Sequence, residues 1–251
     1  MEKIVAALAA QQDELTALVV PLDAAGWARP SRCEGWTVSD VVLHLAQTNE
    51  MAIGSTQGCY DEVAAALAEG LPPATSVDEG AGLMVARERG RPPAEVRARW
   101  QESANTLRHE LGRIEPGRRV QWVAGELSAR TLATTRLAET WIHTGDVAVA
   151  LDHEVVADDR LWHIVRLAWR TLPYAFAQAG HEPAGPVAFA LEAPNGDTWH
   201  FTPDDPPATT IEGTAVDLCN VAGQRADAAD TGLRGEGPDT AAVLALVRTF
   251  A

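Results

Sequence analysis

The chain has 251 residues, enough for one large domain or two smaller ones with a substantial core in either case. Its 35 acidic residues outnumber its 20 basic residues, which gives a formal net charge of −15. This balance argues against nucleic acid or an anionic membrane as the main partner, because phosphate binding requires positive charge. No apolar run approaches a membrane span and the N-terminus lacks a signal-peptide pattern, so we expect a cytoplasmic protein.

The first part of the chain is predicted to be helical. Apolar residues recur at near-helical spacing over residues 2–20, and Pro21 ends that segment. A loop with two Trp residues follows, and then Thr37 or Ser39 can cap a helix that runs to about Ile53. The remaining helices predicted in this part span residues 60–69, 77–90, 94–114 and 128–152. The four principal helices describe a four-helix bundle with extra pieces.

After residue 153 the predicted elements change from helices alone to helices mixed with short strands. A helix over 158–179 precedes strand candidates at 186–191 and 198–202, and the turn between them, Pro-Asn-Gly-Asp, is a good hairpin signal. The later elements are a strand at 209–212, a helix at 214–223, an extended piece near Leu233 and a helix at 238–249. We therefore expect a helical domain over residues 1–155 and a smaller α+β domain over residues 156–251.

One predicted helix carries residues that suit a divalent metal. Glu139 and His143 are four residues apart and lie on one face of helix 128–152, and Asp146 continues that face. His44, surrounded by apolar residues in another helix, is the best-placed third ligand. Together His44, Glu139 and His143 form a ligand set expected for zinc with an open coordination position.

Each of these residues also has an ordinary structural interpretation. Glu139 and His143 could form a solvated helix pair, and His44 could be a core histidine bonded to a backbone carbonyl. Asp146 could orient a ligand histidine or simply cap and solvate its helix. Gln47, one turn after His44, could face the same cavity.

No metal-binding pattern is recognised among the cysteines, and two of the tryptophans are assigned to packing. Cys33, Cys59 and Cys219 are widely separated and form no C-x-x-C pair, which indicates neither a disulfide framework nor a thiolate metal site. Trp27 and Trp36 are interpreted as packing residues at the end of the bundle.

Two sequence motifs resemble a known family. GWTVSDVVLHLAQ, followed about a hundred residues later by AETWIHTGDVAVAL, looks like the DinB-like metal-binding bundle of the mycothiol-dependent maleylpyruvate isomerase family. GTAVDLCNVAGQR is similar to the small C-terminal domain of that family. The fold class implied is mainly α with α+β, a DinB-like four-helix bundle followed by a small α+β domain. The Ala- and Arg-rich composition is typical of GC-rich genomes and fits an actinobacterial host.

The resemblance implies a metal centre and a thiol cosubstrate. A divalent metal, with zinc favoured, would bind His44, Glu139 and His143, and Arg225 would reach from the small domain toward that site. Mycothiol would be the cosubstrate, and its thiolate would add to a small electrophilic substrate as in maleylpyruvate isomerisation. Arg225 could pair with a substrate carboxylate, although a surface arginine in a loop is the alternative for that residue.

Three functions remain open at this point. The leading hypothesis is a metal-dependent isomerase or thiol transferase that uses a low-molecular-weight thiol. A zinc-dependent hydrolase that uses metal-bound water is the second hypothesis, and a non-catalytic, metal-stabilised binding protein is the third. The motifs specify neither the acceptor substrate nor a choice between monomer and homodimer.

Overall fold

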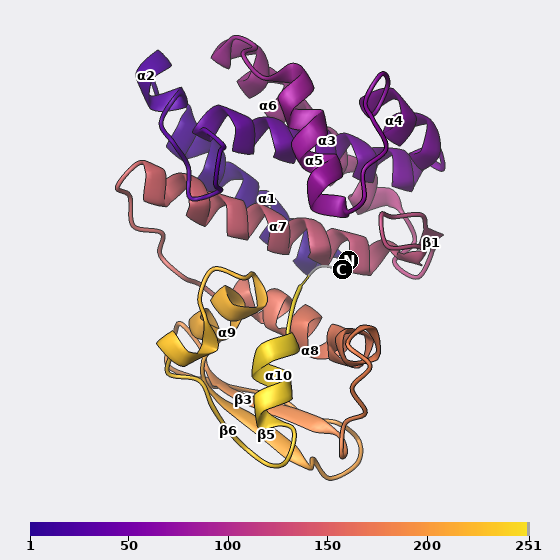
Figure 1. Cartoon of the computed structure of the whole chain (residues 1–251), viewed down its shortest axis with the longest axis vertical. Coiled ribbons are helices and arrows are strands. Elements are labelled where there is room, and N and C mark those ends of the chain that lie inside the picture. The colour runs from indigo at the N-terminus through magenta and orange to yellow at the C-terminus, as the bar shows by residue number, and fades with distance from the viewer. Residues whose placement is uncertain (250–251) are drawn as a thin grey trace. The chain divides into compact units, whose positions relative to one another are not determined.

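A computed structural model describes residues 1–249 of the chain, which folds into two compact units. The first unit is Met1–Val155, and the second begins at Val156 (Figure 1). The first unit is helical apart from one short hairpin, whereas the second combines helices with a small sheet. This organisation confirms the predicted fold class, a mainly α chain with a helical bundle before a small α+β part.

Four long helices form the bundle of the first unit. They are α1 (Glu2–Val19), α3 (Val38–Gln57), α6 (Pro93–Arg113) and α7 (Ala129–Ala150). Both α1 and α3 pack against α6 and α7, so each helix has two neighbours in the bundle. The apolar faces predicted by helical spacing meet in the core, where the fully buried side chains include Leu8, Leu15, Leu45, Trp100, Leu107, Leu132 and Leu137.

Helix α3 extends further than its sequence predicts. Thr37 caps its N-terminus in a reciprocal capping box with Asp40, as expected for the cap. The predicted end near Ile53 is wrong, because the helix continues through Gly54 and ends only at Gly58, which has a φ of 81°. Gly54 lies inside the helix where Val63 packs tightly against it, and a larger side chain at this position would clash with Val63.

Short elements complete the first unit. The structure confirms the two minor helices, α4 (Tyr60–Leu67) and α5 (Val77–Glu88), and adds a one-turn helix, α2 (Ala24–Trp27). The connector before α7 contains an antiparallel pair of two-residue strands, β1 (Arg119–Val120) and β2 (Leu127–Ser128), which the sequence pattern did not reveal. Strands this short carry too few alternating residues to be recognised.

The second unit packs three helices with a four-stranded sheet. Its helices are α8 (Leu161–Gln178), α9 (Ala215–Ala222) and α10 (Thr240–Leu246), with a 3-10 turn, η1 (Ala228–Asp230). Its strands are β3 (Val187–Glu192), β4 (Thr198–Phe201), β5 (Thr209–Thr214) and β6 (Arg234–Glu236), in the order β4-β3-β5-β6. The predicted hairpin is present as antiparallel β3 and β4, whereas β5 runs parallel to β3. The last helix is shorter than the predicted 238–249.

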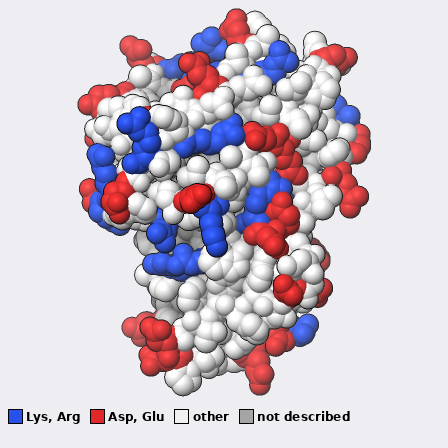
Figure 2. Space-filling view, turned by 180° about the vertical axis from the view of Figure 1, so that it is seen from behind, with Lys and Arg blue, Asp and Glu red and all other residues white. Residues whose placement is uncertain are grey.

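Charged side chains of both signs lie on the surface of the protein. Acidic and basic side chains are interspersed over the face seen in Figure 2. Among the described residues, no helix combines the length and the apolarity that a bilayer span demands.

We expect Thr37→Ala to lower the free energy of unfolding of the bundle by about 1 kcal/mol, because the backbone N–H of Asp40 would lose its acceptor. Denaturant titration followed by Trp fluorescence measures this change. Thr37→Ser keeps the hydroxyl and serves as the control. Equal stability of Thr37→Ala and the unsubstituted protein would show that the capping box does not stabilise α3.

Candidate metal centre

The predicted ligands converge between α3 and α7. Glu139 and His143 stand one turn apart on α7, and His44 reaches them from α3. Their candidate ligand atoms all lie within 4.8 Å of one another. His44 Nε2 lies 2.9 Å from Glu139 Oε1, and the two imidazole rings are 5.0 Å apart at their centroids. The structure therefore brings together side chains that are almost a hundred residues apart in sequence.

Burial keeps His44 neutral. Its side chain is buried, and burial lowers its pKa, an effect that the neighbouring carboxylate of Glu139 only partly offsets. Its buried Nδ1 has no hydrogen-bond partner in the described part of the chain, so the polar contact of the ring is made by Nε2 toward Glu139. A neutral imidazole with a nitrogen aimed into the cluster is the form that binds a metal ion.

Glu139 remains ionised inside the bundle. Burial alone would raise its pKa, but the positive charge of Arg136 and the hydrogen bond to His44 outweigh burial and lower the pKa of this carboxyl group. Arg136 is three residues earlier on α7 and donates to Glu139 Oε2. Glu139 is thus a carboxylate with one oxygen toward Arg136 and the other toward His44.

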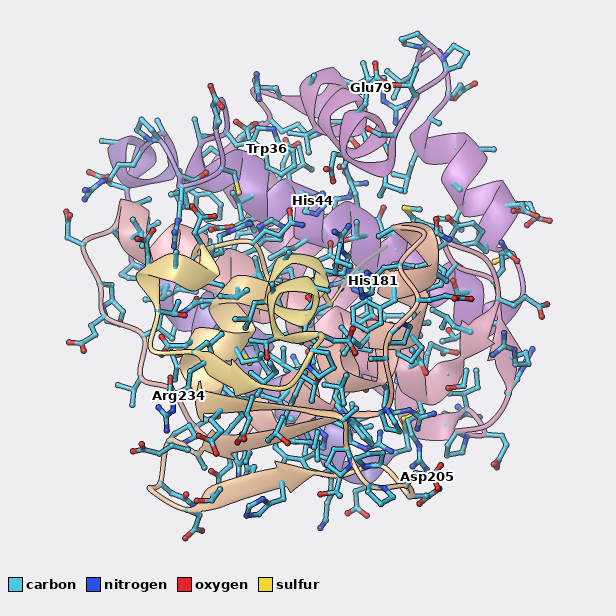
Figure 3. The ribbon with its side chains drawn as sticks, turned by 60° about the horizontal axis from the view of Figure 1, so that its bottom comes forward. Trp36, His44, Glu79, His181, Asp205 and Arg234 are labelled. Atoms are coloured by element: carbon cyan, nitrogen blue, oxygen red, sulfur yellow. The ribbon has the colours of Figure 1, made fainter. Side chains whose placement is uncertain are left out.

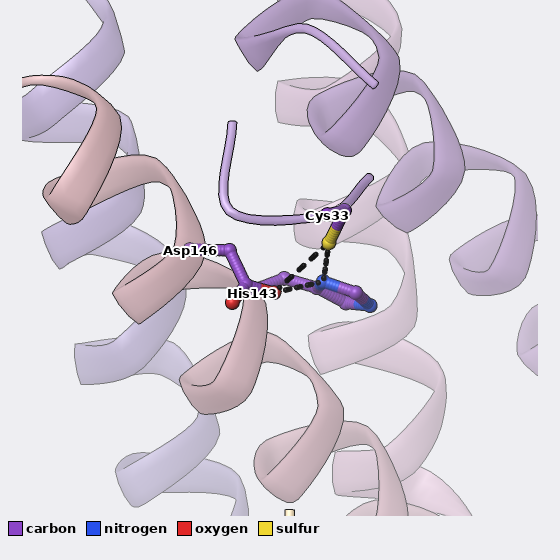
Figure 4. A group of neighbouring side chains, drawn as sticks. All are labelled: Cys33, His143 and Asp146. Carbon is purple, nitrogen blue, oxygen red and sulfur yellow. Dashed lines mark hydrogen bonds and ion pairs between the residues drawn. The ribbon is translucent and has the colours of Figure 1, made fainter. Parts of the chain in front are cut away.

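Asp146 contacts the predicted ligand His143 and a cysteine (Figure 4). The buried Asp146 Oδ2 lies 2.9 Å from His143 Nδ1 and 3.1 Å from Cys33 Sγ, which is itself 3.7 Å from the same His143 nitrogen. A carboxylate at Nδ1 fixes the tautomer of the ring, and Nε2 is then left to bind a metal. An orienting role for Asp146 requires this contact, and the role itself stays a prediction. Cys33, His143 and Asp146 also form a second group with metal-ligand chemistry.

The loop before α3 covers one side of the cluster. Ser31 N–H and its hydroxyl both donate to the Trp36 carbonyl, which closes the loop, and the backbone N–H of Arg32 donates to the Asp146 carbonyl. The ring of Trp36 lies 5.2 Å from that of His44, and both residues are labelled in Figure 3. Trp36 therefore packs directly on a predicted ligand and does more than plug the bundle end.

Two other predicted site residues, Gln47 and Arg225, are hydrogen-bonded to groups that are not predicted ligands. Gln47 is buried, but its amide donates to the Met84 carbonyl and to Glu88 Oε1 on α5. Arg225 follows α9 in the second unit, where its guanidinium donates to the carbonyl of Gly223. A role for Arg225 in the reaction stays a prediction.

The donor set suits a tetrahedral divalent ion. Zinc bonds of about 2.0–2.2 Å to nitrogen and oxygen place two ligand atoms of a tetrahedral site about 3.3 Å apart. The 2.9 Å between His44 Nε2 and Glu139 Oε1 is about 0.4 Å shorter, so a small outward movement of these side chains would admit the ion. Two imidazoles and one carboxylate leave a fourth position for a water or a substrate atom.

Sequence reasoning missed two residues that touch the cluster. Arg136 precedes Glu139 by three residues, and helical spacing alone could have indicated that pair. Cys33 offered no such signal, because 110 residues separate it from His143 and its loop has no periodicity.

Comparison with known proteins gives a family match and two relatives. The family model described as "Mycothiol maleylpyruvate isomerase N-terminal domain" matches residues 8–148. Two uncharacterised proteins of Mycobacterium tuberculosis, from strains CDC 1551 / Oshkosh and H37Rv, are each 35% identical over 250 residues. The alignments cover 98% of this chain and 95% of each relative.

Solved structures show the same fold. The crystal structure of a mycothiol-dependent maleylpyruvate isomerase superimposes with a TM-score of 0.61 at 20% sequence identity. A histidine-to-alanine mutant of such an isomerase gives a TM-score of 0.62 at 18% identity, and both matches cover 95% of each chain. At these identities the likeness establishes the arrangement of helices and strands.

We expect Asp146→Asn to weaken zinc binding by about 10- to 100-fold, because the amide cannot hold His143 as the carboxylate does. Competition with a chromophoric chelator measures the affinity. Asp239→Asn is the matched control, since Asp239 is also buried and accepts from a histidine, His181, in the second unit. Equal zinc affinities of the two variants would contradict an orienting role for Asp146.

Proposed function

The chain belongs to the mycothiol maleylpyruvate isomerase family, and on this premise we propose that it is a divalent-metal-dependent enzyme that uses a low-molecular-weight thiol. Mycothiol is the thiol proposed, and zinc is the metal proposed. The observation that carries the proposal is the convergence of His44, Glu139 and His143, whose ligand atoms lie within 4.8 Å of one another.

Three side chains would hold the metal and leave it open to substrate. His44 and His143 offer one ring nitrogen each and Glu139 one carboxylate oxygen, a set that leaves a coordination position vacant. When bound, such an ion supplies a positive charge that makes a thiol acidic enough to lose its proton near neutral pH.

Neighbouring residues prepare the ligands. Asp146 accepts a hydrogen bond from His143 Nδ1 and so leaves Nε2 to bind the metal. Arg136 keeps Glu139 ionised by placing a positive charge beside it. Trp36 packs an apolar ring against His44 and limits the access of water to that side.

The proposed reaction is addition of the cosubstrate thiol to a small electrophile. The sulfur adds to a conjugated double bond, the resulting single bond rotates, and elimination of the same thiol leaves the trans isomer. A substrate carboxylate would accept a bidentate pair of hydrogen bonds from Arg225, which favours the negative charge that develops on the adduct. Thiol transfer to an acceptor that retains the sulfur would use the same first step.

Metal analysis combined with thiol binding tests the proposal. Purified protein should contain about one equivalent of divalent metal per chain, and saturating mycothiol should raise the melting temperature of the metal-loaded form only. His44→Ala and His143→Ala should lose most of the metal and the thiol-dependent shift together. His109→Ala is the control, because His109 is exposed on α6 and contacts Arg113.

The outcomes separate the alternatives. Hydrolysis of a test ester without added thiol would favour the metal hydrolase, whereas metal-dependent stability with neither reaction would favour a binding protein. Metal-loaded protein that mycothiol does not stabilise would contradict the proposed cosubstrate.

We expect Arg225→Ala to reduce turnover of a carboxylate-bearing electrophile by about 100-fold, the size expected for losing one charge-stabilising donor, with the metal content unchanged. Arg248→Ala, at another arginine of the second unit, is the control. Steady-state kinetics and metal analysis on the same preparations measure both effects. Parallel loss of metal and turnover would refute the assigned role of Arg225.

A further inference from the structure

The guanidinium of Arg136 is buried in the bundle beside the predicted ligands. Its side chain has 0% exposure, although arginine is among the residues that are least often buried. One terminal nitrogen donates to Glu139 Oε2, and the other lies 3.2 Å from Asn49 Oδ1 on α3. The ring of Trp122 lies 6.0 Å from the guanidinium carbon. Asn49 and Trp122, both neutral, are thus among its neighbours besides Glu139.

A buried charge of this kind requires a partner. Moving an unpaired guanidinium out of water costs several kcal/mol, a large part of the net stability of a typical domain, so its carboxylate partner is held firmly. Within residues 1–249 the buried Nε of Arg136 has no hydrogen-bond partner, so Glu139 accepts from one terminal nitrogen of Arg136 and not from a bidentate pair. Glu139 Oε2 is therefore engaged by Arg136, and Oε1 is the oxygen that faces His44.

We propose that Arg136 is a positioning residue that restricts Glu139 to single-oxygen coordination of the metal and so keeps a coordination position open for the thiol. This inference rests on the proposed metal site. A carboxylate can bind a cation through one oxygen or through both. Because Oε2 is hydrogen-bonded to Arg136, Oε1 is the oxygen left to bind the ion. The open coordination position is then not filled by the second oxygen of Glu139.

The same contact weakens metal binding. A guanidinium beside the ligand carboxylate neutralises part of its charge and repels a dication in an interior where charges are poorly screened. Removal of Arg136 should therefore have two effects at once. The cation should bind more tightly, and Glu139 should be free to bind it through both oxygens.

Cobalt substitution and zinc affinity measured on matched variants test this inference. Arg136→Met removes the charge while keeping most of the side-chain volume, and Arg136→Lys restores the charge. Arg99→Met is the matched control, because Arg99 on α6 also pairs with two carboxylates, Glu50 and Glu88, which are not among the predicted ligands. The visible absorption of Co²⁺ weakens as its coordination number rises, which reports directly on the vacant position.

The expected result is specific to Arg136. In Arg136→Met the zinc affinity should rise by about tenfold or more, and the Co²⁺ absorption should fall toward that of a higher coordination number. Arg136→Lys should restore the zinc affinity to within about threefold of that of the unsubstituted protein. Arg99→Met should lower the melting temperature and leave both metal readouts unchanged.

Contrary results are equally clear. An unchanged Co²⁺ spectrum in folded Arg136→Met, or a zinc affinity that only falls, would overturn the inference. If Arg136→Met does not fold, Asn49→Ala decides, because loss of its hydrogen bond should loosen Arg136 and shift both readouts in the same direction, and no shift would overturn the inference. Absence of metal from the unsubstituted protein would instead refute the proposed function.

Discussion

The carboxylate of Glu139 lies in the helical bundle between the guanidinium of Arg136 and the imidazole of His44. Arg136 and His44 both stabilise the negative charge of this carboxylate against the cost of its burial. The contact also joins the two helices, since Arg136 and Glu139 belong to α7 whereas His44 belongs to α3. The packing of α3 against α7 thus depends on these polar contacts as well as on the apolar core around them.

The bundle provides the rigidity that such a contact needs. Both helices are packed on α6 or α1, and the polar residues of α7 that face inward, Thr140, Thr144 and Asp146 among them, are fully buried. Buried polar groups are costly unless bonded, so each one restricts how the helices can rotate or slide. His143, which is hydrogen-bonded to Asp146, and Glu139, which is hydrogen-bonded to Arg136, consequently lie one turn apart in defined directions.

The loop before α3 supplies part of the surroundings of the cluster. This loop, which ends at Thr37, places Cys33 beside His143 and Trp36 beside His44, and its own backbone hydrogen bonds keep it closed. Loops on a rigid scaffold commonly carry the residues that distinguish related sites. In this chain the loop supplies a sulfur and an aromatic ring, while the helices supply the candidate ligands.

Helical periodicity by itself predicted the helical bundle and placed three of the candidate site residues on one helix face. The spacing of Glu139, His143 and Asp146 on a single helix follows from about 3.6 residues per turn, and neighbours three or four apart must meet whatever the rest of the chain does. Hairpin chemistry likewise revealed β3 and β4, because a turn acts over a few residues. Only tertiary packing could decide that β5 runs parallel to β3, that Cys33 lies at His143, that Gln47 faces α5 and that Arg136 is buried against Glu139. Those contacts depend on which helix faces and loops meet in space, and that choice is made by the free energy of the whole core, not by any local pattern.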